Sequence, residues 1–194
     1  MTLKQDDTIE IIPATPEFIK LLIANEYSTA GELMSVVIPN GWPNDPDAIA
    51  GLSWHLKALE RDPNELLWRI RLVVLRSNRG VIGSINLKGM PDKDGTVEIG
   101  WGISEDYRRR GIATRATEAV MEWAFSQPGV KRVIATIPRN NTRSERVAQR
   151  LGMKQTGEMQ RGLPVWAKEK GESAKTNKGH AAEAAKRVSH DTRR

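Results

Sequence analysis

The 194-residue sequence contains no cysteine. This absence excludes disulfides, thiolate-bound metals and a cysteine nucleophile, and it is typical of a reducing compartment, so we expect a cytoplasmic location. Histidine occurs only at positions 55, 180 and 190, and the last two lie in a polar C-terminal segment. We interpret His55 as a packed helix residue, and we predict no metal cofactor.

Long apolar runs are also missing. No stretch reaches the length of a membrane span, and the first seven residues, MTLKQDD, lack the apolar centre of a signal peptide. We therefore expect no membrane partner. Apolar residues nevertheless make up 39% of the chain, and six tryptophans supply large surfaces for burial, so the sequence has enough material for one globular domain.

The net charge of +6 is unevenly distributed along the chain. Residues 168–194 hold eight Lys or Arg and four Asp or Glu, whereas the rest of the chain holds 22 basic and 20 acidic residues. Within residues 169–194, Val188 is the only large apolar residue, so this segment cannot offset its ordering entropy by burial. We predict a domain over residues 1–168 and a basic, disordered tail over 169–194. The nearly neutral body argues against nucleic acid as a partner.

The spacing of apolar residues predicts an α+β fold. Strands are expected at residues 8–12, 68–76, 81–88, 96–103, 132–137, 154–159 and 164–168, and helices at 15–24, 29–37, 45–60, 116–126 and from 142 to about 151. Consecutive strands joined by short turns indicate an antiparallel meander. The strand–helix–strand unit over residues 96–137 indicates one parallel pair, formed by a right-handed crossover. The prediction is a mixed, mostly antiparallel sheet flanked by helices.

A basic turn with one glycine joins strand 96–103 to the following helix. Residues 107–114 read YRRRGIAT. The first amides of a helix have no intrahelical partner, Gly111 permits close backbone approach, and arginines donate forked hydrogen bonds to oxyanions. This combination predicts a phosphate-binding turn, although a run of solvated surface arginines is the alternative interpretation. Neither a Walker-A lysine with Ser/Thr nor a G-x-G-x-x-G pattern is present, which argues against nucleoside triphosphate and dinucleotide sites.

The pattern Arg108-x-x-Gly111-x-Ala113 resembles the R/Q-x-x-G-x-G/A pyrophosphate loop of the GCN5-related N-acetyltransferases (GNAT). The surrounding sequence is similar too: VEIGW at residues 97–101 precedes the loop, and NTRS at 141–144 with LGM at 151–153 follow it. The likeness spans about residues 73–158. Order and spacing are closest to the branch that includes ribosomal-protein N-terminal acetyltransferases. The resemblance implies a GNAT-like sheet of about seven strands with its parallel pair at the cofactor cleft.

The resemblance also implies acetyl-CoA as the acetyl donor and an amine as the acceptor. It assigns cofactor contacts to Trp101, Ile103, Arg108, Arg109, Arg110, Gly111, Ile112, Ala113, Thr114 and Asn141. The diphosphate would lie on the amides of residues 109–114, and the pantetheine along the strand that ends at Ile103. An amide near Gly100 or Trp101 would polarise the thioester carbonyl. Asn141 is also a natural turn residue before a helix.

Catalysis requires removal of a proton from the acceptor ammonium. Glu98 is the candidate base, because it is an acid within an otherwise apolar strand; the alternative is that strand alternation points it outward. Many family members carry a tyrosine seven residues after the asparagine, whereas this chain has Ala148. The proton for the departing thiolate then comes from Ser144 or from water, or the thiolate leaves without being protonated. The last route is feasible because the pKa of a thiol is about 8.5, which makes the thiolate a reasonable leaving group.

These observations predict an N-acetyltransferase that moves an acetyl group from acetyl-CoA to a primary amine by direct attack in a ternary complex. The acceptor would be a protein N-terminus or a small-molecule amine. The alternative is a non-catalytic acyl-CoA-binding regulatory module whose basic tail docks a polyanion.

Overall fold

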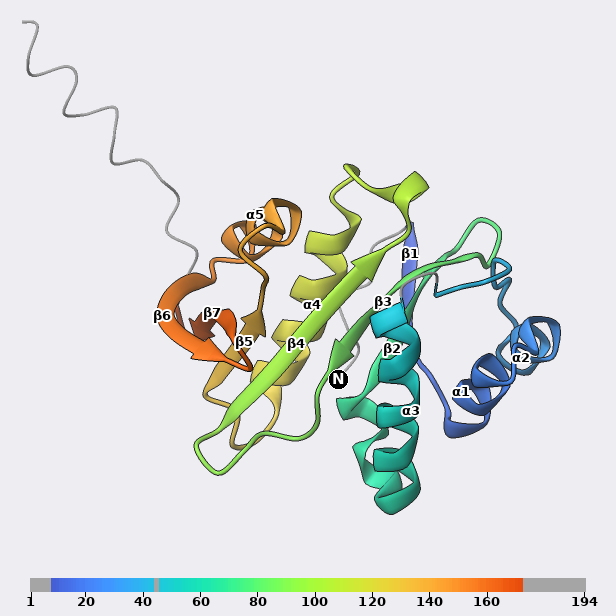
Figure 1. Cartoon of the computed structure of the whole chain (residues 1–194), viewed down its shortest axis with the longest axis horizontal. Helices are drawn as coiled ribbons and strands as arrows, with labels where there is room; N and C mark the ends of the chain where they lie inside the picture. Colours follow the sequence, from blue (N-terminus) through green and yellow to red (C-terminus); the bar gives the residue numbers. More distant parts are fainter. Residues whose placement is uncertain (1–7, 44–45, 173–194) are drawn as a thin grey trace, which may run out of the picture.

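The computed structural model describes residues 8–43 and 46–172, so residues 173–194 of the predicted tail lie outside it. Seven strands form one sheet in the order β1-β2-β3-β4-β5-β7-β6 (Figure 1). Their bounds are β1 Ile9–Pro13, β2 Ile70–Leu75, β3 Val81–Leu87, β4 Thr96–Ile103, β5 Arg132–Thr136, β6 Lys154–Gln160 and β7 Leu163–Glu169. Only β4 and β5 pair in parallel, and the other neighbours are antiparallel. The predicted α+β fold is confirmed.

Five α-helices and two short 3₁₀ helices complete the described residues. Their bounds are α1 Pro16–Ile23, α2 Tyr27–Met34, α3 Pro46–Arg61, η1 Pro63–Trp68, η2 Glu105–Tyr107, α4 Ile112–Ser126 and α5 Thr142–Arg150. The Thr15 hydroxyl caps α1 by accepting from the Phe18 amide at 3.2 Å, as its sequence predicts. Several boundaries differ from expectation: α4, for example, begins at Ile112 rather than at residue 116, and α2 begins at Tyr27 rather than at residue 29. Trp68 belongs to η1 rather than to a strand, and α2 ends at Met34 because Ser35 adopts a left-handed conformation.

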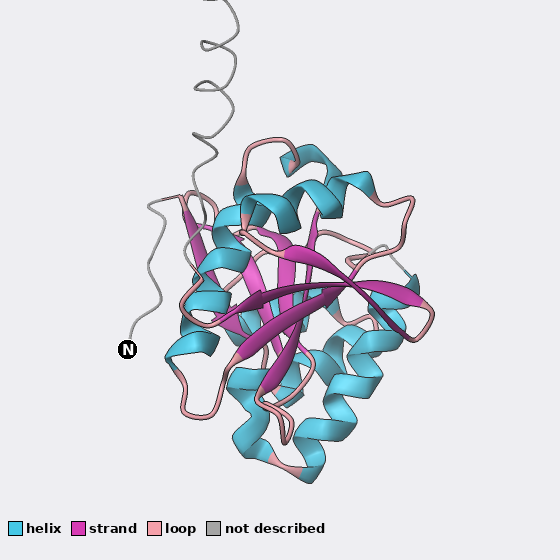
Figure 2. Ribbon diagram, turned by 90° about the vertical axis from the view of Figure 1, so that its left-hand side faces the viewer, coloured by secondary structure: helices cyan, strands magenta, loops and turns pink. Residues whose placement is uncertain are grey.

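Helices cover both faces of the sheet, and strand alternation supplies a core to each (Figure 2). On β2, Leu72 and Val74 belong to the core beneath α1 and α3, together with Phe18 and Leu59. Val73 points the other way, into the core with α4. Each such fully buried aliphatic or aromatic side chain contributes roughly 1.5–3 kcal/mol relative to exposure. Residues that neighbour each other along a strand thus serve opposite faces, which decides where the site residues point.

The strands β4 and β5 separate part of the way along. Their parallel register covers only Thr96–Glu98 against residues 132–134, whereas β4 stays paired with β3 as far as Ile103. Beyond Thr136 the chain leaves β4, and the Ile137 amide donates to Pro164 O at 3.0 Å. The carboxyl-terminal half of β4 therefore has a paired edge and an open edge. The open edge leads directly into η2 and α4.

Candidate functional site

A cavity of about 490 Å³ lies where β4 leads through η2 into α4, against α5. It is lined by Trp101, Gly102, Ile103, Tyr107, Arg108, Arg109, Ile112, Ala113, Asn141, Arg143, Ser144, Arg146, Val147 and Arg150. Seven of the ten predicted cofactor residues are among them, namely Trp101, Ile103, Arg108, Arg109, Ile112, Ala113 and Asn141. The structure thus brings the basic turn and the Asn141 segment together across about 30 residues of sequence.

The basic turn presents a row of unused backbone donors. Arg109 and Gly111 both adopt left-handed conformations, with φ of 61° and 74°, and α4 begins at Ile112. Within the described part of the chain, no amide of residues 109–114 donates a hydrogen bond, and the Arg115 amide is the first to do so, to Gly111 O at 3.1 Å. The amides of the first helical turn, with the positive end of the helix dipole, form an anion-binding arrangement.

The three arginines of this turn have different surroundings. Arg108 Nε donates to Ile103 O at 2.9 Å, which fixes the turn to the end of β4. Arg110 Nη2 donates to Asp106 O at 3.0 Å, and its guanidinium lies over the Tyr107 ring, so this side chain is used inside the turn. Arg109 has no such partner among the described residues and lines the cavity. Of the three, Arg109 is the one whose guanidinium is available to a bound anion.

Three predicted cofactor residues do not line the cavity with their side chains: Arg110, Gly111 and Thr114. Arg110 is turned back into the loop, as described above. Gly111 has no side chain and caps α4, while the Thr114 hydroxyl is buried without a hydrogen-bond partner in the described region. For Gly111 and Thr114, only the backbone amide remains as a means of contact.

The open edge of β4 carries the backbone groups of its odd-numbered residues. Lys88 N donates to Glu98 O, and Ser104 N donates to Ile82 O, so the even-numbered residues direct their backbone groups toward β3. Trp101 therefore directs its amide toward the gap beside β5, whereas Gly100 does not. Of the two amides that the sequence left open as the carbonyl-polarising donor, the register favours Trp101.

Asn141 and Ser144 meet at the start of α5. Asn141 is the N-cap, because its Oδ1 accepts from the Ser144 amide at 3.1 Å, and Thr142 is the first helical residue rather than the cap. Both side chains line the cavity, and the Asn141 side-chain amide keeps its N–H donors for a ligand. Ala148, at the position of the family's tyrosine, is fully buried in the core with α4 and offers no acid.

Three charged residues of the cavity escaped the sequence-based prediction: Arg143, Arg146 and Arg150. They follow one another at intervals of three and four residues, so they share one face of α5. The signal in the sequence is this spacing of arginines directly after Asn141. Its meaning becomes visible only once α5 is packed beside the basic turn.

Glu98 lies on the opposite face of the sheet. Trp101 packs against the core with α4, and Glu98 points away from that core, because an odd and an even residue of one strand point apart. The Glu98 side chain is only 8% exposed. Its Oε1 accepts from Lys88 Nζ at 2.5 Å and from Thr136 Oγ1 at 2.8 Å, and Arg161 Nη2 donates to both of its oxygens at 2.5 and 2.7 Å.

These contacts determine the charge of Glu98. Burial raises the pKa of its carboxyl, but hydrogen bonds from Arg161, Lys88 and Thr136 outweigh burial and hold the pKa below the usual value. Arg161 lies in the turn between β6 and β7, so its ion pair with Glu98 ties that hairpin across β5 to β4. A carboxylate with a lowered pKa and occupied oxygens is a poor proton acceptor, and this environment argues for an anchoring role.

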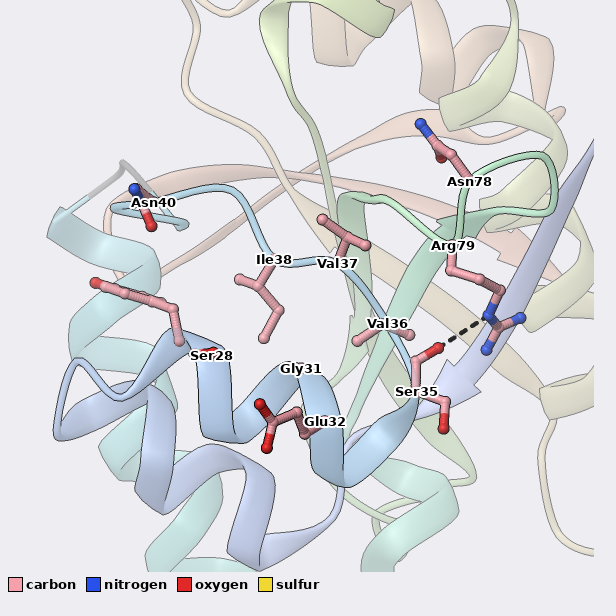
Figure 3. A pocket seen from close by; sticks show the side chains of 11 residues that line it. Ser28, Gly31, Glu32, Ser35, Val36, Val37, Ile38, Asn40, Asn78 and Arg79 are labelled. Atoms are coloured by element: carbon pink, nitrogen blue, oxygen red, sulfur yellow. Dashed lines mark hydrogen bonds between the residues drawn. The ribbon is translucent and has the colours of Figure 1, made fainter.

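A second cavity of about 720 Å³ lies away from the first, between α2, residues 35–40 and the β2–β3 turn (Figure 3). It shares no lining residue with the first cavity. Arg79, its only cation, donates to Ser35 O at 3.0 Å and is ion-paired with Glu10. No residue predicted from the sequence lines this cavity, and its positive charge is already neutralised.

Among the described residues, no group of three or more His, Asp or Glu side chains is arranged to hold a metal ion. No helix in the described ranges combines the length and the hydropathy that crossing a bilayer requires.

Comparison with known proteins relates the chain to one family. The family model for the acetyltransferase (GNAT) domain matches residues 10–154. The uncharacterized N-acetyltransferase YjdG of Bacillus subtilis (strain 168) is 26% identical over 126 residues, which are 65% of this chain and 69% of YjdG. YnaD, an uncharacterized N-acetyltransferase of the same organism, is 35% identical over 69 residues, which are 36% of this chain and only 41% of YnaD.

Solved structures share the fold. The microcin C7 self-immunity acetyltransferase MccE, in complex with acetyl-CoA and AMP, has a TM-score of 0.57 and 15% identity, covering 84% of this chain and 93% of that one. RimL, a ribosomal L7/L12 α-N-protein acetyltransferase in complex with coenzyme A, has a TM-score of 0.57 and 14% identity, covering 86% and 97%.

Proposed function

This chain belongs to the GNAT acetyltransferase family, and from that premise we propose that it binds acetyl-CoA in the cavity between β4, α4 and α5 and transfers the acetyl group to a primary amine. The family makes the chain an acyltransferase. One observation carries the assignment of the donor: the unused backbone amides after Arg109 and the open edge of β4 border the same cavity. Two proteins of the same fold, MccE and RimL, hold acetyl-CoA or coenzyme A.

The proposed donor position follows from the charges and the backbone. The diphosphate lies on the amides of residues 109–114 with Arg109 beside it, since these groups are free donors at a helix N-terminus. The pantetheine runs along Trp101 and Ile103 as an added strand would. The thioester carbonyl then reaches the Trp101 amide, which stabilises negative charge on that oxygen during attack.

In the reaction, the neutral amine attacks the thioester carbon, a C–N bond forms and the C–S bond breaks. The thiolate needs little help, because the pKa of a thiol is about 8.5. The Ser144 hydroxyl lines the cavity and is the proposed donor to the departing sulfur, with water as the alternative. We assign removal of the amine proton to solvent and give Glu98 a positioning role, because its carboxylate is held by Lys88 and Arg161.

The acceptor is proposed to approach from the face that carries Glu98. Gly100 and Gly102 lie on this face of β4 and leave its surface without side chains. The space at Gly100 is narrow, because a Cβ there would lie 2.4 Å from Asn86 Oδ1. The acceptor class stays as the sequence predicts, a protein N-terminus or a small-molecule amine. The absence of cysteine supports a cytoplasmic location.

Two measurements test the function. Isothermal titration with acetyl-CoA should show one site per chain, and thiol release over a panel of peptides and small amines should show turnover with at least one of them. Binding without turnover on any amine would favour the alternative, a regulatory acyl-CoA-binding module with a polyanion-docking tail. Failure of acetyl-CoA to bind at millimolar concentration would refute both.

A further inference from the structure

The cavity holds more positive charge than a diphosphate requires. Five guanidinium groups line it, and no Asp or Glu does; the five are Arg108, Arg109, Arg143, Arg146 and Arg150. A diphosphate diester carries two negative charges and is served by the backbone amides and by Arg109, since Arg108 donates to Ile103 O and is ion-paired with Glu105. The remaining three arginines, all on α5, form a second basic wall that this ligand group does not use.

The α5 wall is electrostatically unfavourable while the cavity holds no anion. Arg143 stands in the first helical turn, where the helix dipole disfavours a cation. Arg143 and Arg146 are three residues apart, Arg146 and Arg150 are four apart, and like charges at these spacings repel. Within the described part of the chain, none of the three forms a hydrogen bond or an ion pair. Only Arg150, in the last turn of α5, gains from the helix dipole, so among the described residues Arg143 and Arg146 have no compensating partner.

The packing of α5 fixes the direction of this wall. Ala148 is fully buried against the core with α4, and Asn141 caps the helix through the Ser144 amide. These two constraints set the rotation of α5 about its axis, so the arginines border the cavity on the side that faces the basic turn. The wall is therefore a second concentration of positive charge, separate from the amides of residues 109–114.

Building on the proposed function, we infer that the three arginines of α5 bind the 3′-phosphate of coenzyme A, so that the enzyme distinguishes coenzyme A thioesters from their 3′-dephospho forms. A phosphate monoester is a dianion with three acceptor oxygens, which suits several forked guanidinium donors better than a diester does. A second phosphate on the same molecule as the diphosphate engages both walls at once, and the three unpaired charges of α5 then face a dianion.

Titration calorimetry with coenzyme A and 3′-dephospho-coenzyme A tests this inference, because it needs no acceptor amine. The native protein should bind coenzyme A at least about tenfold more tightly, the equivalent of one charge-assisted hydrogen bond. In the triple variant R143A/R146A/R150A this preference should fall to about twofold or less, with the affinity for the dephospho form nearly unchanged. Arg139→Ala is the matched control: it removes one exposed charge just before α5 that does not line the cavity.

Three results would contradict the inference. Equal affinities of the native protein for the two ligands would overturn it while leaving the proposed function intact. An equal loss of affinity for both ligands in the triple variant would assign the α5 arginines to general charge rather than to the 3′-phosphate. A lower unfolding temperature of the ligand-free triple variant would show a structural role, since relief of repulsion should leave that temperature equal or raised. If neither ligand binds, the proposed function itself fails.

Discussion

Substitution of Glu98 by glutamine separates an anchor from a general base. The change keeps the size of the side chain but removes the charge that faces Lys88 and Arg161. Hydrogen bonds to a charged group contribute about 1.5–3 kcal/mol, and the pair with the half-exposed Arg161 contributes about 0.2–1 kcal/mol of this, so we expect Glu98→Gln to destabilise the fold by about 1–3 kcal/mol. Arg161→Ala should cost less than about 1 kcal/mol.

The pH dependence of this contribution has a definite sign. The folded-state pKa of Glu98 is lowered from 4.5, so its stabilising effect is present above pH 4.5 and is lost as pH falls through the folded-state value. Urea unfolding of the native protein and of Glu98→Gln should therefore converge in acid. A constant difference between them down to the lowest pH would mean that the ion pairs do not stabilise the fold.

Steady-state kinetics then decide the role of Glu98. If Glu98 anchors the β6–β7 turn, Glu98→Gln and Arg161→Ala should both raise the KM for the amine severalfold and leave kcat within about threefold of the native value. Arg161→Lys should then restore part of the lost affinity for the amine. A general base predicts another outcome: Glu98→Gln lowers kcat by about 10²–10⁴, the acidic limb of the pH–rate profile disappears, and Arg161→Ala reproduces neither effect. That outcome would refute the anchoring argument.

Three further predictions concern other residues. Burial, together with the positive charges of Arg69 and Lys88, lowers the pKa of His55 from 6.5 to about 3. Below pH 6.5 the unfolded chain therefore binds a proton at His55 that the folded chain does not bind, so the stability of the fold decreases as the pH drops below 6.5. The loss between pH 7 and 5 should be about 2 kcal/mol in urea unfolding, and His55→Leu should flatten it; an unchanged slope would contradict this assignment. Gly111 has a φ of 74°, so Gly111→Ala should lower the free energy of unfolding by about 1–2 kcal/mol and weaken coenzyme A binding in calorimetry. Gly129→Ala is the control, because φ there is 81° and an added Cβ meets nothing within 4 Å. This variant should lose a similar amount of stability and leave coenzyme A binding unchanged. Arg71 is 1% exposed, and its guanidinium lies 4.3 Å from the Trp123 ring centroid. In urea unfolding, Arg71→Met should change stability by less than about 1.5 kcal/mol, whereas Arg71→Ala should lower it by about 2–5 kcal/mol. Equal losses in the two variants would show that the charge of Arg71 matters more than its packing.

The fold was predictable where local signals agree. Strand 96–103 has the bounds that its alternation indicates, and Thr15 with Pro16 starts a helix as expected. The signals fail where two neighbours satisfy the same rule. Both Asn141 and Thr142 are good N-caps, and the structure selects Asn141. Trp68 continues the apolar alternation of the next strand, yet the cap at Asp62 and Pro63 draws it into a 3₁₀ helix.

The candidate site was predictable to the extent that its chemistry is local. The amides after Arg109 and the start of a helix near Asn141 follow from sequence, because each depends on a few adjacent residues. The α5 wall and the environment of Glu98 do not, because both arise from contacts between distant segments. Arg161 is 63 residues from Glu98, and no periodicity within either segment indicates that the two meet. A pattern reveals an unusual residue, and only the fold identifies its partner.

The distribution of charge suggests how the enzyme acts without a dedicated base. Five arginines line the donor cavity, and Lys88 and Arg161 outnumber Glu98 on the acceptor face. Positive charge near an ammonium group lowers its pKa, because like charges disfavour the protonated form. An amine at the reaction centre would therefore lose its proton to water more readily than in bulk solution. On this reasoning the arginines of the donor cavity attract the phosphates of the donor, whereas Lys88 and Arg161 help to keep the acceptor neutral and nucleophilic.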